Sequence, residues 1–352
     1  MAISAAIFIE SNTSGSGADF ILRAQELGLV TVFVTASPER YSFLHGSPEL
    51  DLRICDTSSD VAISAVVDDV AAVMPIELLT TSSDLYLHAA ALQARRLGLI
   101  GPDPDAIALC RDKARQAAAL REGGVGVPYS AVVGADCDIR NAITRIGLPA
   151  VVKPISGTGS VGVTLVETET DAIQALRNLL GTTTDVRGRP IQSGALIMSY
   201  IAGDEFSVEI LDSRVIGVTR KHLGNLPHFV EIGHDAPAMM SPQLRAQIVC
   251  EALRAIAVLR HARGPAHVEL RVHQGSITII EVNPRLAGGS IPTLFRHATG
   301  FDLVLAFLCS LLGVPPRLRA QARTVRSDSS CRSAKAFSTS LSPASALSTA
   351  SD

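Results

Sequence analysis

Apolar and polar residues alternate along the chain with two periods, one typical of strands and one typical of helices. In residues 1–100, the strand-like runs AAIFIE and LVTVFVT enclose a helix-like run, ADFILRAQELG, which ends at Gly28. A later run, DLYLHAAALQARRLG, has helical spacing, with Asp84 as its expected N-cap and Gly98 just beyond its last turn. Strands that alternate with helices predict a parallel sheet covered by helices. We therefore expect an N-terminal, Rossmann-like α/β domain over residues 1–101.

Residues 102–200 predict a linker helix followed by a small subdomain. Residues 102–128 have the pattern of a single capped helix that ends in glycines. The pattern then predicts, in order, the strand AVVG, the helix DCDIRNAITRIG, the strand PAVVKP and the helix DAIQALRNLLG. In GALIMSYIAGDEFSVEIL, two strand-like runs are separated by a turn at Gly203.

Residues 201–316 predict an α+β subdomain, and residues 317–352 predict a Ser-rich tail. The helix PQLRAQIVCEALRAIAVLRH, a hairpin within 267–284 and a last helix, FDLVLAFLCSLLG, follow the strands. In residues 317–352, ten are Ser, six are Lys or Arg, and two are Asp. Apolar periodicity is lost there, so we expect this segment to be disordered and to contain no strand.

Composition and charge exclude several classes of protein. The 352-residue chain has 31 Lys and Arg against 34 Asp and Glu, and no basic block lies in the first 316 residues, so we expect no nucleic-acid partner. The longest apolar run, residues 303–314, is too short to cross a bilayer, and the N-terminus lacks the basic region of a signal peptide. The six cysteines are scattered without metal-ligand spacing. We expect a cytoplasmic protein with no membrane partner.

The stretch VVKPISGTGSVGV, residues 151–163, contains Gly157, Gly159 and Gly162 in the spacing G-x-G-x-x-G. A dinucleotide-binding loop with this spacing lies between a strand and a helix, but these glycines lie between two strand-like segments and so predict a hairpin. The loop also lacks the Lys-Ser/Thr that ends a Walker A motif. Two interpretations remain: a hairpin whose backbone N–H groups cover phosphates beside Lys153, or a Gly-rich surface turn beside a solvated lysine.

The stretch HVELRVHQGSITIIEVNP, residues 267–284, predicts a hairpin that turns at Gln274-Gly275-Ser276. Cross-strand partners in a symmetric hairpin have position numbers with a constant sum. Glu269 is therefore expected to face Glu281, and His267 to face Asn283. Alternation places these four residues and Arg271 on one face of the hairpin. The residues expected on the opposite, core face are Val268, Leu270, Val272, Ile280 and Val282.

Two carboxylates that face each other across a hairpin destabilise it unless something compensates their charge. A shared proton, a basic side chain or a divalent cation could do so. Glu269, Glu281 and the amide oxygen of Asn283 form the all-oxygen ligand set that Mg²⁺ prefers, with Mn²⁺ as an alternative ion. In the other interpretation, Arg271 or Arg285 neutralises the pair in a structural ion-pair cluster. Because the two carboxylates repel each other without a cation, Glu281→Gln should leave the stability of the ligand-free protein unchanged or slightly higher.

With these residues in hand, the chain resembles the ATP-grasp superfamily, and within it the carboxylate–amine ligases that are similar to L-amino-acid ligases. The resemblance covers residues 1 to about 316 and is carried by DKARQAAALREGGVGVP, VVKPISGTGSVGV, YIAGDEFSVEI and HVEL…EVNPRLAGGSIP, in that order. It implies an ATP-grasp fold, α/β and α+β. The N-terminal α/β domain would be followed by a small lid carrying the glycine hairpin and a C-terminal domain carrying the Mg²⁺ hairpin.

The resemblance also implies roles for individual residues. Lys113 and Lys153 would contact the phosphates of ATP, Glu205 would bind the ribose, and Arg285 would act with Lys153 on the transferred phosphoryl group. Mg²⁺ would be held by Glu269, Glu281 and Asn283. The phosphate-covering loop would include Ser156, Gly157, Gly159, Ser160 and Gly162. The backbone contacts to adenine would come from Met198, Ser199, Tyr200 and Ile201. The residues expected to face the substrates are Glu231, His234, Gly288 and Gly289.

The reaction implied by the resemblance is ATP-dependent ligation of a carboxylate to an amine through an acyl phosphate, with release of ADP and phosphate. Amino acids are the expected substrates, an amide or dipeptide is the expected product, and a homodimer is one option for the assembly. The C-terminal stretch RTVRSDSSCRSAKAF departs from the family, whose members continue with ordered chain. The alternative function is therefore an ATP-binding protein whose catalysis is weakened or lost through this altered C-terminus. A nicotinamide-dependent oxidoreductase is a third option, and it would need a helix after Gly162.

Overall fold

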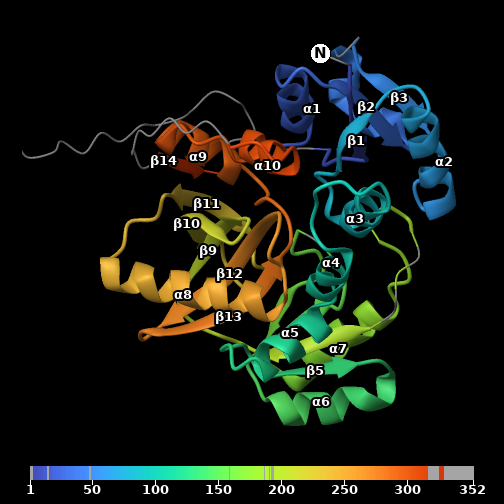
Figure 1. Ribbon diagram of the computed structural model, residues 1–352. Coiled ribbons are helices and arrows are strands. Elements are labelled where there is room, and N and C mark those ends of the chain that lie inside the picture. The colour runs from blue at the N-terminus through green and yellow to red at the C-terminus, as the bar shows by residue number, and fades with distance from the viewer. Residues whose placement is uncertain are drawn as a thin grey trace, which may run out of the picture.

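The computed structural model describes residues 3–13, 16–46, 49–157, 159–185, 187–189, 191, 194–315 and 325–328. The described strands form three sheets, which we call the N-terminal, lid and C-terminal sheets. In Figure 1 the N-terminal sheet lies at the top, the lid sheet at the bottom and the C-terminal sheet at the left. This mixed α/β and α+β architecture confirms the predicted fold class.

The N-terminal sheet is parallel throughout and has the strand order β3-β2-β1-β4. Its strands are β1 (Ala5–Ile9), β2 (Val30–Thr35), β3 (Asp51–Ile54) and β4 (Ile76–Thr80). The helices that accompany it are α1 (Gly17–Glu26), α2 (Asp60–Ala71) and α3 (Leu87–Arg96), with the short 3₁₀ helices η1 (Pro38–Arg40), η2 (Ser42–Gly46) and η3 (Asp84–Tyr86). Every residue of β1 is buried, as expected for a parallel strand covered on both faces.

The two faces of the N-terminal sheet belong to different cores. On one face, Phe8 of β1 packs edge-on against Phe20 of α1, which in turn packs edge-on against Phe307 of a C-terminal helix. On the other face, Ile7 joins Ile63 of α2 in a separate apolar cluster. Because one core is shared with the C-terminal helices, the N-terminal sheet is held against the C-terminal part of the chain (Figure 1).

Residues 102–128 do not form the single helix that the sequence predicts. They form α4 (Pro104–Arg111) and α5 (Lys113–Glu122), separated by Asp112. Asp112 has an extended backbone (φ −89°, ψ 101°), and its carboxylate accepts hydrogen bonds from the N–H groups of Ala114 and Arg115. The side chain therefore caps a new helix, a use of Asp that competes with helix continuation.

The lid sheet is antiparallel with the strand order β5-β8-β6-β7. Its strands are β5 (Ser130–Val133), β6 (Ala150–Pro154), β7 (Thr164–Val166) and β8 (Ala195–Ser199). Its helices are α6 (Ile139–Ile146), preceded by the 3₁₀ helix η4 (Asp136–Asp138), and α7 (Glu169–Leu180). Strands β6 and β7 pair antiparallel and enclose the glycines, so the predicted hairpin is present and no helix follows Gly162.

The C-terminal sheet has six strands in the order β13-β12-β9-β10-β11-β14, all antiparallel to their neighbours. They are β9 (Asp204–Leu211), β10 (Arg214–Leu223), β11 (Glu231–Ala236), β12 (Pro265–His273), β13 (Ser276–Asn283) and β14 (Val325–Asp328). Helix α8 (Pro242–Val258) covers one face of the sheet, and α9 (Ile291–Thr299) and α10 (Leu303–Leu311) lie between this sheet and α1 (Figure 1).

Two C-terminal elements differ from the sequence prediction. Helix α9 was not predicted, because the sequence pattern indicated only one helix, FDLVLAFLCSLLG, after the hairpin. The expectation that residues 317–352 contain no strand is wrong for β14, whose backbone pairs with β11 from Gly233↔Asp328 to Ala236↔Val325. Pairing with the open edge of β11 supplies the hydrogen bonds that a short polar strand needs, without any apolar periodicity of its own. The other residues of the predicted tail lie outside the described part of the chain.

Within the described ranges, no single helix is long and apolar enough to cross a membrane. The helices α9 and α10, taken together, have sufficient length and apolar composition, but they are bent by 99° relative to each other. We retain the boundaries at residues 101 and 200 as a proposal, which the distribution of the three sheets supports, whereas β14 extends the C-terminal sheet beyond the proposed boundary at 316.

The β12–β13 hairpin has the predicted pairs but not the predicted symmetry. His267 pairs with Asn283 and Glu269 with Glu281, as the constant sum requires. The register then shifts, so that Leu270 pairs with Ile279, and the turn has only Gln274 and Gly275, with φ values of 49° and 81°. A β-bulge therefore absorbs the residue that a three-residue turn would have used.

The bulge reverses the expected positions of two isoleucines. The assignment of Ile280 to the core is wrong, because Ile280 lines the cavity described below, and Ile279 is the core residue, with 1% of its surface exposed. Positive φ at both turn residues matches a two-residue turn whose twist fits a hairpin, which explains why the turn is shorter than predicted.

The bulge predicts that these neighbours have different roles. Ile279→Ala should lower the free energy of unfolding by about 2–5 kcal/mol, because it leaves a cavity in the core. The matched variant Ile280→Ala should cost less stability and instead weaken ligand binding in the cavity. Urea unfolding monitored by circular dichroism, with ATP binding measured by calorimetry, tests both. Equal losses of stability would contradict the observed register.

Candidate active site

A cavity of about 750 Å³ lies between the lid sheet and the C-terminal sheet. It brings together nearly all the residues that the sequence singled out. Those that line it are Lys113, Lys153, Gly157, Gly159, Ser160, Gly162, Met198, Ser199, Tyr200, Ile201, Glu205, Glu231, Glu269, Glu281, Asn283, Arg285, Gly288 and Gly289. Ser156 and His234 are the two predicted residues outside the lining. Residues from five separate stretches thus converge on one space.

Glu281 lies between two buried lysines. Its carboxylate oxygens are 3.0 Å from Nζ of Lys113 and 3.3 Å from Nζ of Lys153, and the side chains of the two lysines are 9% and 5% exposed. Burial would raise the pKa of Glu281, but the charges of Lys113 and Lys153 lower it. For Lys153, burial is the largest effect and lowers the pKa, against the pull of Glu281. The carboxylate of Glu281 therefore depends on the two lysines for its charged form.

The break at Asp112 places Lys113 in this site. Lys113 is the first residue of α5, its backbone N–H donates to the carbonyl of Ile155, and its Nζ donates to the carbonyl of Gly157 at 2.9 Å. One turn later, the side-chain amide of Gln116 donates to the carbonyl of Val282 and accepts from its N–H, at 2.8 and 2.9 Å. Gln116 thus joins α5 to the edge of β13 beside Glu281, and sequence reasoning did not find it.

Glu269 has a separate set of partners. Its oxygens lie 3.2 Å from Nε2 of His267 and 3.5 Å from Nζ of Lys221, and Nδ2 of Asn283 donates to it at 3.3 Å. Burial opposes ionisation, but Lys221 and His267 hold the pKa of Glu269 well below its usual range. The pKa of His267, which burial alone would lower, is raised to about 9 by Glu209 and Glu269.

Lys221 was not predicted from the sequence, although it contacts three of the predicted residues. Its Nζ lies 2.6 Å from Glu231, 3.3 Å from Glu205 and 3.5 Å from Glu269, and its side chain is 2% exposed. Burial would lower the pKa of Lys221, but the three carboxylates raise it. No local pattern indicated this role, because Lys221 lies between Arg220 and His222 and its anionic partners come from other strands.

The opposed carboxylates are therefore compensated by lysines and His267, and the charge of Arg285 also lowers the pKa of Glu269. The alternative in which Arg271 neutralises the pair does not hold, because Arg271 binds Glu205. Arg271 donates to Glu205 from Nε at 3.1 Å and from Nη2 at 2.9 Å, and to the carbonyl of Ile201 at 2.7 Å. Its guanidinium also lies 5.4 and 5.3 Å from the ring centroids of Tyr200 and Phe229. Arg271 thus orients the expected ribose and adenine contacts.

The backbone of residues 198–201 is partly committed to the fold. The N–H of Ser199 donates to the carbonyl of Tyr129, and the N–H of Tyr200 donates to the carbonyl of Pro149. Within this described segment, Ile201 has no backbone acceptor for its N–H, which makes it the donor we expect for a purine. The Met198 side chain is 3% exposed and contributes mainly packing.

The donor set fits Mg²⁺. Glu269 and Glu281 face each other on adjacent strands, and Asn283 lies on the same face two residues beyond Glu281. In the described part of the chain, no three His, Cys, Asp or Glu side chains form a complete metal cage. Mg²⁺ needs none, because it is held by one or two carboxylates and completes its shell with water and phosphate oxygens.

The substrate-side residues form a chain of contacts. Glu231 accepts from Nε2 of His234 at 2.9 Å, and His234 is buried behind the cavity wall. Burial would raise the pKa of Glu231, but His234 and Lys221 lower it to about 2. His234 therefore supports Glu231 from outside the cavity.

Arg285 is held by the N-terminal domain. Its Nε donates to Oδ2 of Asp84 at 2.6 Å, and Nη1 donates to the carbonyl of Leu286 at 3.0 Å. Burial would lower its pKa, but the carboxylate of Asp84 raises it. The prediction that Asp84 caps helix α3 is wrong: it begins η3, and its side chain binds Arg285. A local helix signal could not reveal a partner about 200 positions away.

Comparison with known proteins agrees with this geometry. Residues 146–293 match the family model of the ATP-grasp domain. A solved structure of an L-amino acid ligase from Bacillus licheniformis superposes with a TM-score of 0.76 over 92% of this chain and 79% of that chain, at 24% identity. At this identity the likeness establishes the fold. Residues 146–293 match the ATP-grasp domain family, and the likeness to the ligase structure extends the same fold over 92% of the chain.

Two proteins are similar to this chain in sequence. The protein y4rH of Sinorhizobium fredii is 28% identical over 299 residues, which cover 85% of this chain and 62% of that protein. Carnosine synthase 1 of Mus musculus is 29% identical over 260 residues, which cover 68% of this chain. The match spans only 31% of carnosine synthase 1, so this chain corresponds to part of that larger protein.

The lysine pair reverses the stability effect expected at Glu281. Glu281→Gln should lower the stability of the ligand-free protein by about 1–3 kcal/mol, because it leaves two buried ammonium groups without their counter-charge. The control Glu169→Gln removes an exposed partner of Arg140 and should have little effect. Denaturant unfolding without nucleotide or metal measures both. Unchanged or raised stability of Glu281→Gln would show that repulsion between the carboxylates dominates.

Glu231 predicts a specific acid dependence. Its pKa in the folded protein, about 2, lies below the ordinary value of 4.5, so its ionised form stabilises the fold above pH 4.5. That contribution is lost as the pH falls through about 2. The stability difference between the wild type and Glu231→Gln should therefore be full above pH 4.5 and shrink below it. A difference independent of pH, measured by thermal unfolding between pH 2.5 and 6, would exclude this linkage.

Proposed function

We propose that the protein is an ATP-dependent carboxylate–amine ligase that forms an amide or dipeptide through an acyl phosphate and releases ADP and phosphate. The observation that carries this proposal is the convergence of the Glu269–Glu281 pair, Lys113 and Lys153 beneath the glycine hairpin in one cavity. The names of two relatives, an L-amino acid ligase and carnosine synthase, support the ligase class and amino-acid substrates.

Each part of the cavity has a role in this proposal. The Ile201 N–H and Glu205 would bind the nucleoside, with Arg271 holding Glu205 in position. Lys113 and Lys153 would exchange Glu281 for phosphate oxygens, and the hairpin with Gly157, Gly159 and Gly162 would close over the phosphates. The positive φ of these three glycines turns backbone N–H groups in directions that other residues rarely adopt.

Glu269, Glu281 and Asn283 would hold Mg²⁺, which neutralises charge on the phosphates when it is bound. Arg285, fixed by Asp84, would bind the substrate carboxylate and then the phosphoryl group that is transferred to it. Gly288 and Gly289 would offer N–H groups to the same anion, and Glu231 would bind the ammonium of the incoming amine. Phosphoryl transfer leaves the protein mainly positioning and charge stabilisation to supply, and these residues supply both.

The test is a matrix of amino-acid pairs incubated with protein, ATP and Mg²⁺, scored for nucleotide products and by mass spectrometry. We expect ADP and phosphate to appear in proportion to a dipeptide or amide, and turnover to stop when a chelator removes the metal. Lys153→Ala should lower kcat/KM by roughly 100-fold or more, the size seen when a charge-stabilising donor is removed. The control Arg140→Ala, an exposed lid cation, should leave turnover unchanged.

Stoichiometric AMP would exclude the acyl-phosphate route. ADP bound tightly, with no amino acid increasing its release, would favour the alternative of an ATP-binding protein with weakened catalysis.

A further inference from the structure

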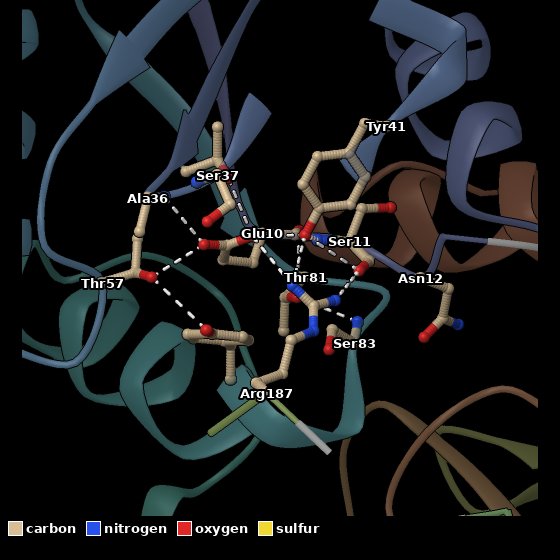
Figure 2. Close-up of polar contacts among 12 residues, drawn as sticks. Glu10, Ser11, Asn12, Ala36, Ser37, Tyr41, Thr57, Thr81, Ser83 and Arg187 are labelled. Carbon is tan, nitrogen blue, oxygen red and sulfur yellow. Dashed lines mark hydrogen bonds and ion pairs between the residues drawn. The ribbon is translucent and has the colours of Figure 1, made fainter. Parts of the chain in front are cut away.

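A second group of charged and aromatic side chains lies outside the cavity, at the carboxyl ends of the N-terminal strands. Figure 2 shows Arg187, from the loop between α7 and β8 of the lid, pointing into a cluster around Glu10 and Tyr41. The catalytic proposal gives this group no role. Its members come from parts of the chain about 150 positions apart.

Glu10 is buried and held from several sides. It directly follows β1, its side chain is 1% exposed, and its φ of 55° is in the left-handed region, which is uncommon outside glycine. The groups that donate to its carboxylate are the N–H of Ala36 at 2.9 Å, the hydroxyls of Thr35 at 2.9 Å and Thr57 at 2.7 Å, and the hydroxyl of Tyr41. A strained residue held this firmly indicates a constraint beyond folding.

Arg187 completes the group. Its Nη1 donates to the Tyr41 hydroxyl at 2.9 Å and lies 3.4 Å from Glu10, and its Nη2 donates to the carbonyl of Ser11 at 3.0 Å (Figure 2). Its Cζ also lies 5.7 and 5.9 Å from the ring centroids of Tyr41 and Tyr86. This set of partners suits a planar guanidinium better than a compact ammonium, because it offers two hydrogen-bond acceptors, a carboxylate and two aromatic rings.

The lid loop is shaped to present this side chain. The carboxylate of Asp185 accepts from the N–H groups of Arg187 at 2.8 Å and Arg189 at 3.0 Å, and from Nε of Arg189 at 2.8 Å. The guanidinium of Arg189 lies 4.6 Å from the ring centroid of Tyr86. Both arginines therefore contact the ring of Tyr86 from one internally bonded turn.

Tyr86 connects this contact to the cavity. It lies in η3, and Asp84, two residues earlier in the same 3₁₀ helix, holds Arg285 at 2.6 Å. The short helix η3 therefore contacts both groups: its Tyr86 ring contacts Arg187 and Arg189, and its Asp84 side chain binds Arg285.

We propose that Glu10, Tyr41 and Tyr86 form a guanidinium-binding site of the N-terminal domain, which Arg187 fills to anchor the lid and to hold η3 and Arg285 in place. Arg187 is in this view a positioning residue. The site recognises the guanidinium group itself, so a small free guanidinium should bind when Arg187 is removed.

Hydrogen exchange of Arg187→Ala tests the proposal without nucleotide or substrate. We expect roughly 10- to 100-fold loss of amide protection in peptides covering 181–191 and 84–90, the size that follows from losing charged hydrogen bonds. Millimolar methylguanidinium should restore protection at 84–90 saturably but not at 181–191, because the free ion fills the site without tethering the loop. Methylammonium at the same concentration should restore neither.

Two further variants complete the test. Arg177→Ala, which removes an exposed pair with Asp136 inside the lid, should change neither peptide. Adding Tyr41→Phe to Arg187→Ala should abolish the response to methylguanidinium, because it removes one acceptor while keeping the ring. Unchanged protection in Arg187→Ala, or a loss at 84–90 that methylguanidinium does not reverse, would overturn the proposal.

Discussion

Two carboxylates that face each other across a hairpin are the constraint around which the cavity is organised. Glu269 and Glu281 lie on adjacent strands, and each is compensated by a different set of cations. Lys113 and Lys153, which reach Glu281, come from α5 and from the lid. Lys221 and His267, which reach Glu269, come from the C-terminal sheet itself. The charge balance therefore requires the lid, the linker helix and the C-terminal sheet to be assembled together.

This dependence suits a site that binds polyanions. Like charges in a buried space are tolerated only with partners, and partners that bind a carboxylate through charge can also bind a phosphate. In the ligand-free protein the carboxylate of Glu281 forms ion pairs with Lys113 and Lys153 and holds their side chains in place. A metal bound to the carboxylates would leave the same lysines available to phosphate oxygens. The same side chains can therefore balance their charges both in the ligand-free protein and in the protein with metal and nucleotide bound.

The sequence was informative where the determining interactions are local. The G-x-G-x-x-G hairpin could be separated from a dinucleotide loop because its flanking segments are strand-like, and the facing of Glu269 and Glu281 followed from counting outward from a turn. The bulge at Ile280 could not be found in this way, because a two-residue turn with a bulge and a three-residue turn without one give the same pairs near Glu269.

The remaining errors concern partners distant in sequence. Asp84 was interpreted as a helix cap because its partner, Arg285, is about 200 positions away in the sequence. Strand β14 was missed because it forms by pairing with the edge of β11 and does not need an apolar pattern of its own. Lys221 and Gln116 were missed for the same reason, because partners of each lie on strands that are distant from them in the sequence. Apolar periodicity describes which face of an element is buried, but it does not identify the polar partner of a buried charge.

The extended residue at Asp112 has a consequence for how this architecture tolerates change in length. In a continuous helix, one inserted residue rotates everything beyond it by about 100°. Here the helix ends and begins again, and the rotation of α5 is set by its own cap and by Gln116 on β13. Insertions within α4 would therefore be absorbed at the break, while one between Lys113 and Gln116 would turn the lysine away from the cavity. The surface of α4 is free to diverge, whereas the first turn of α5 is not.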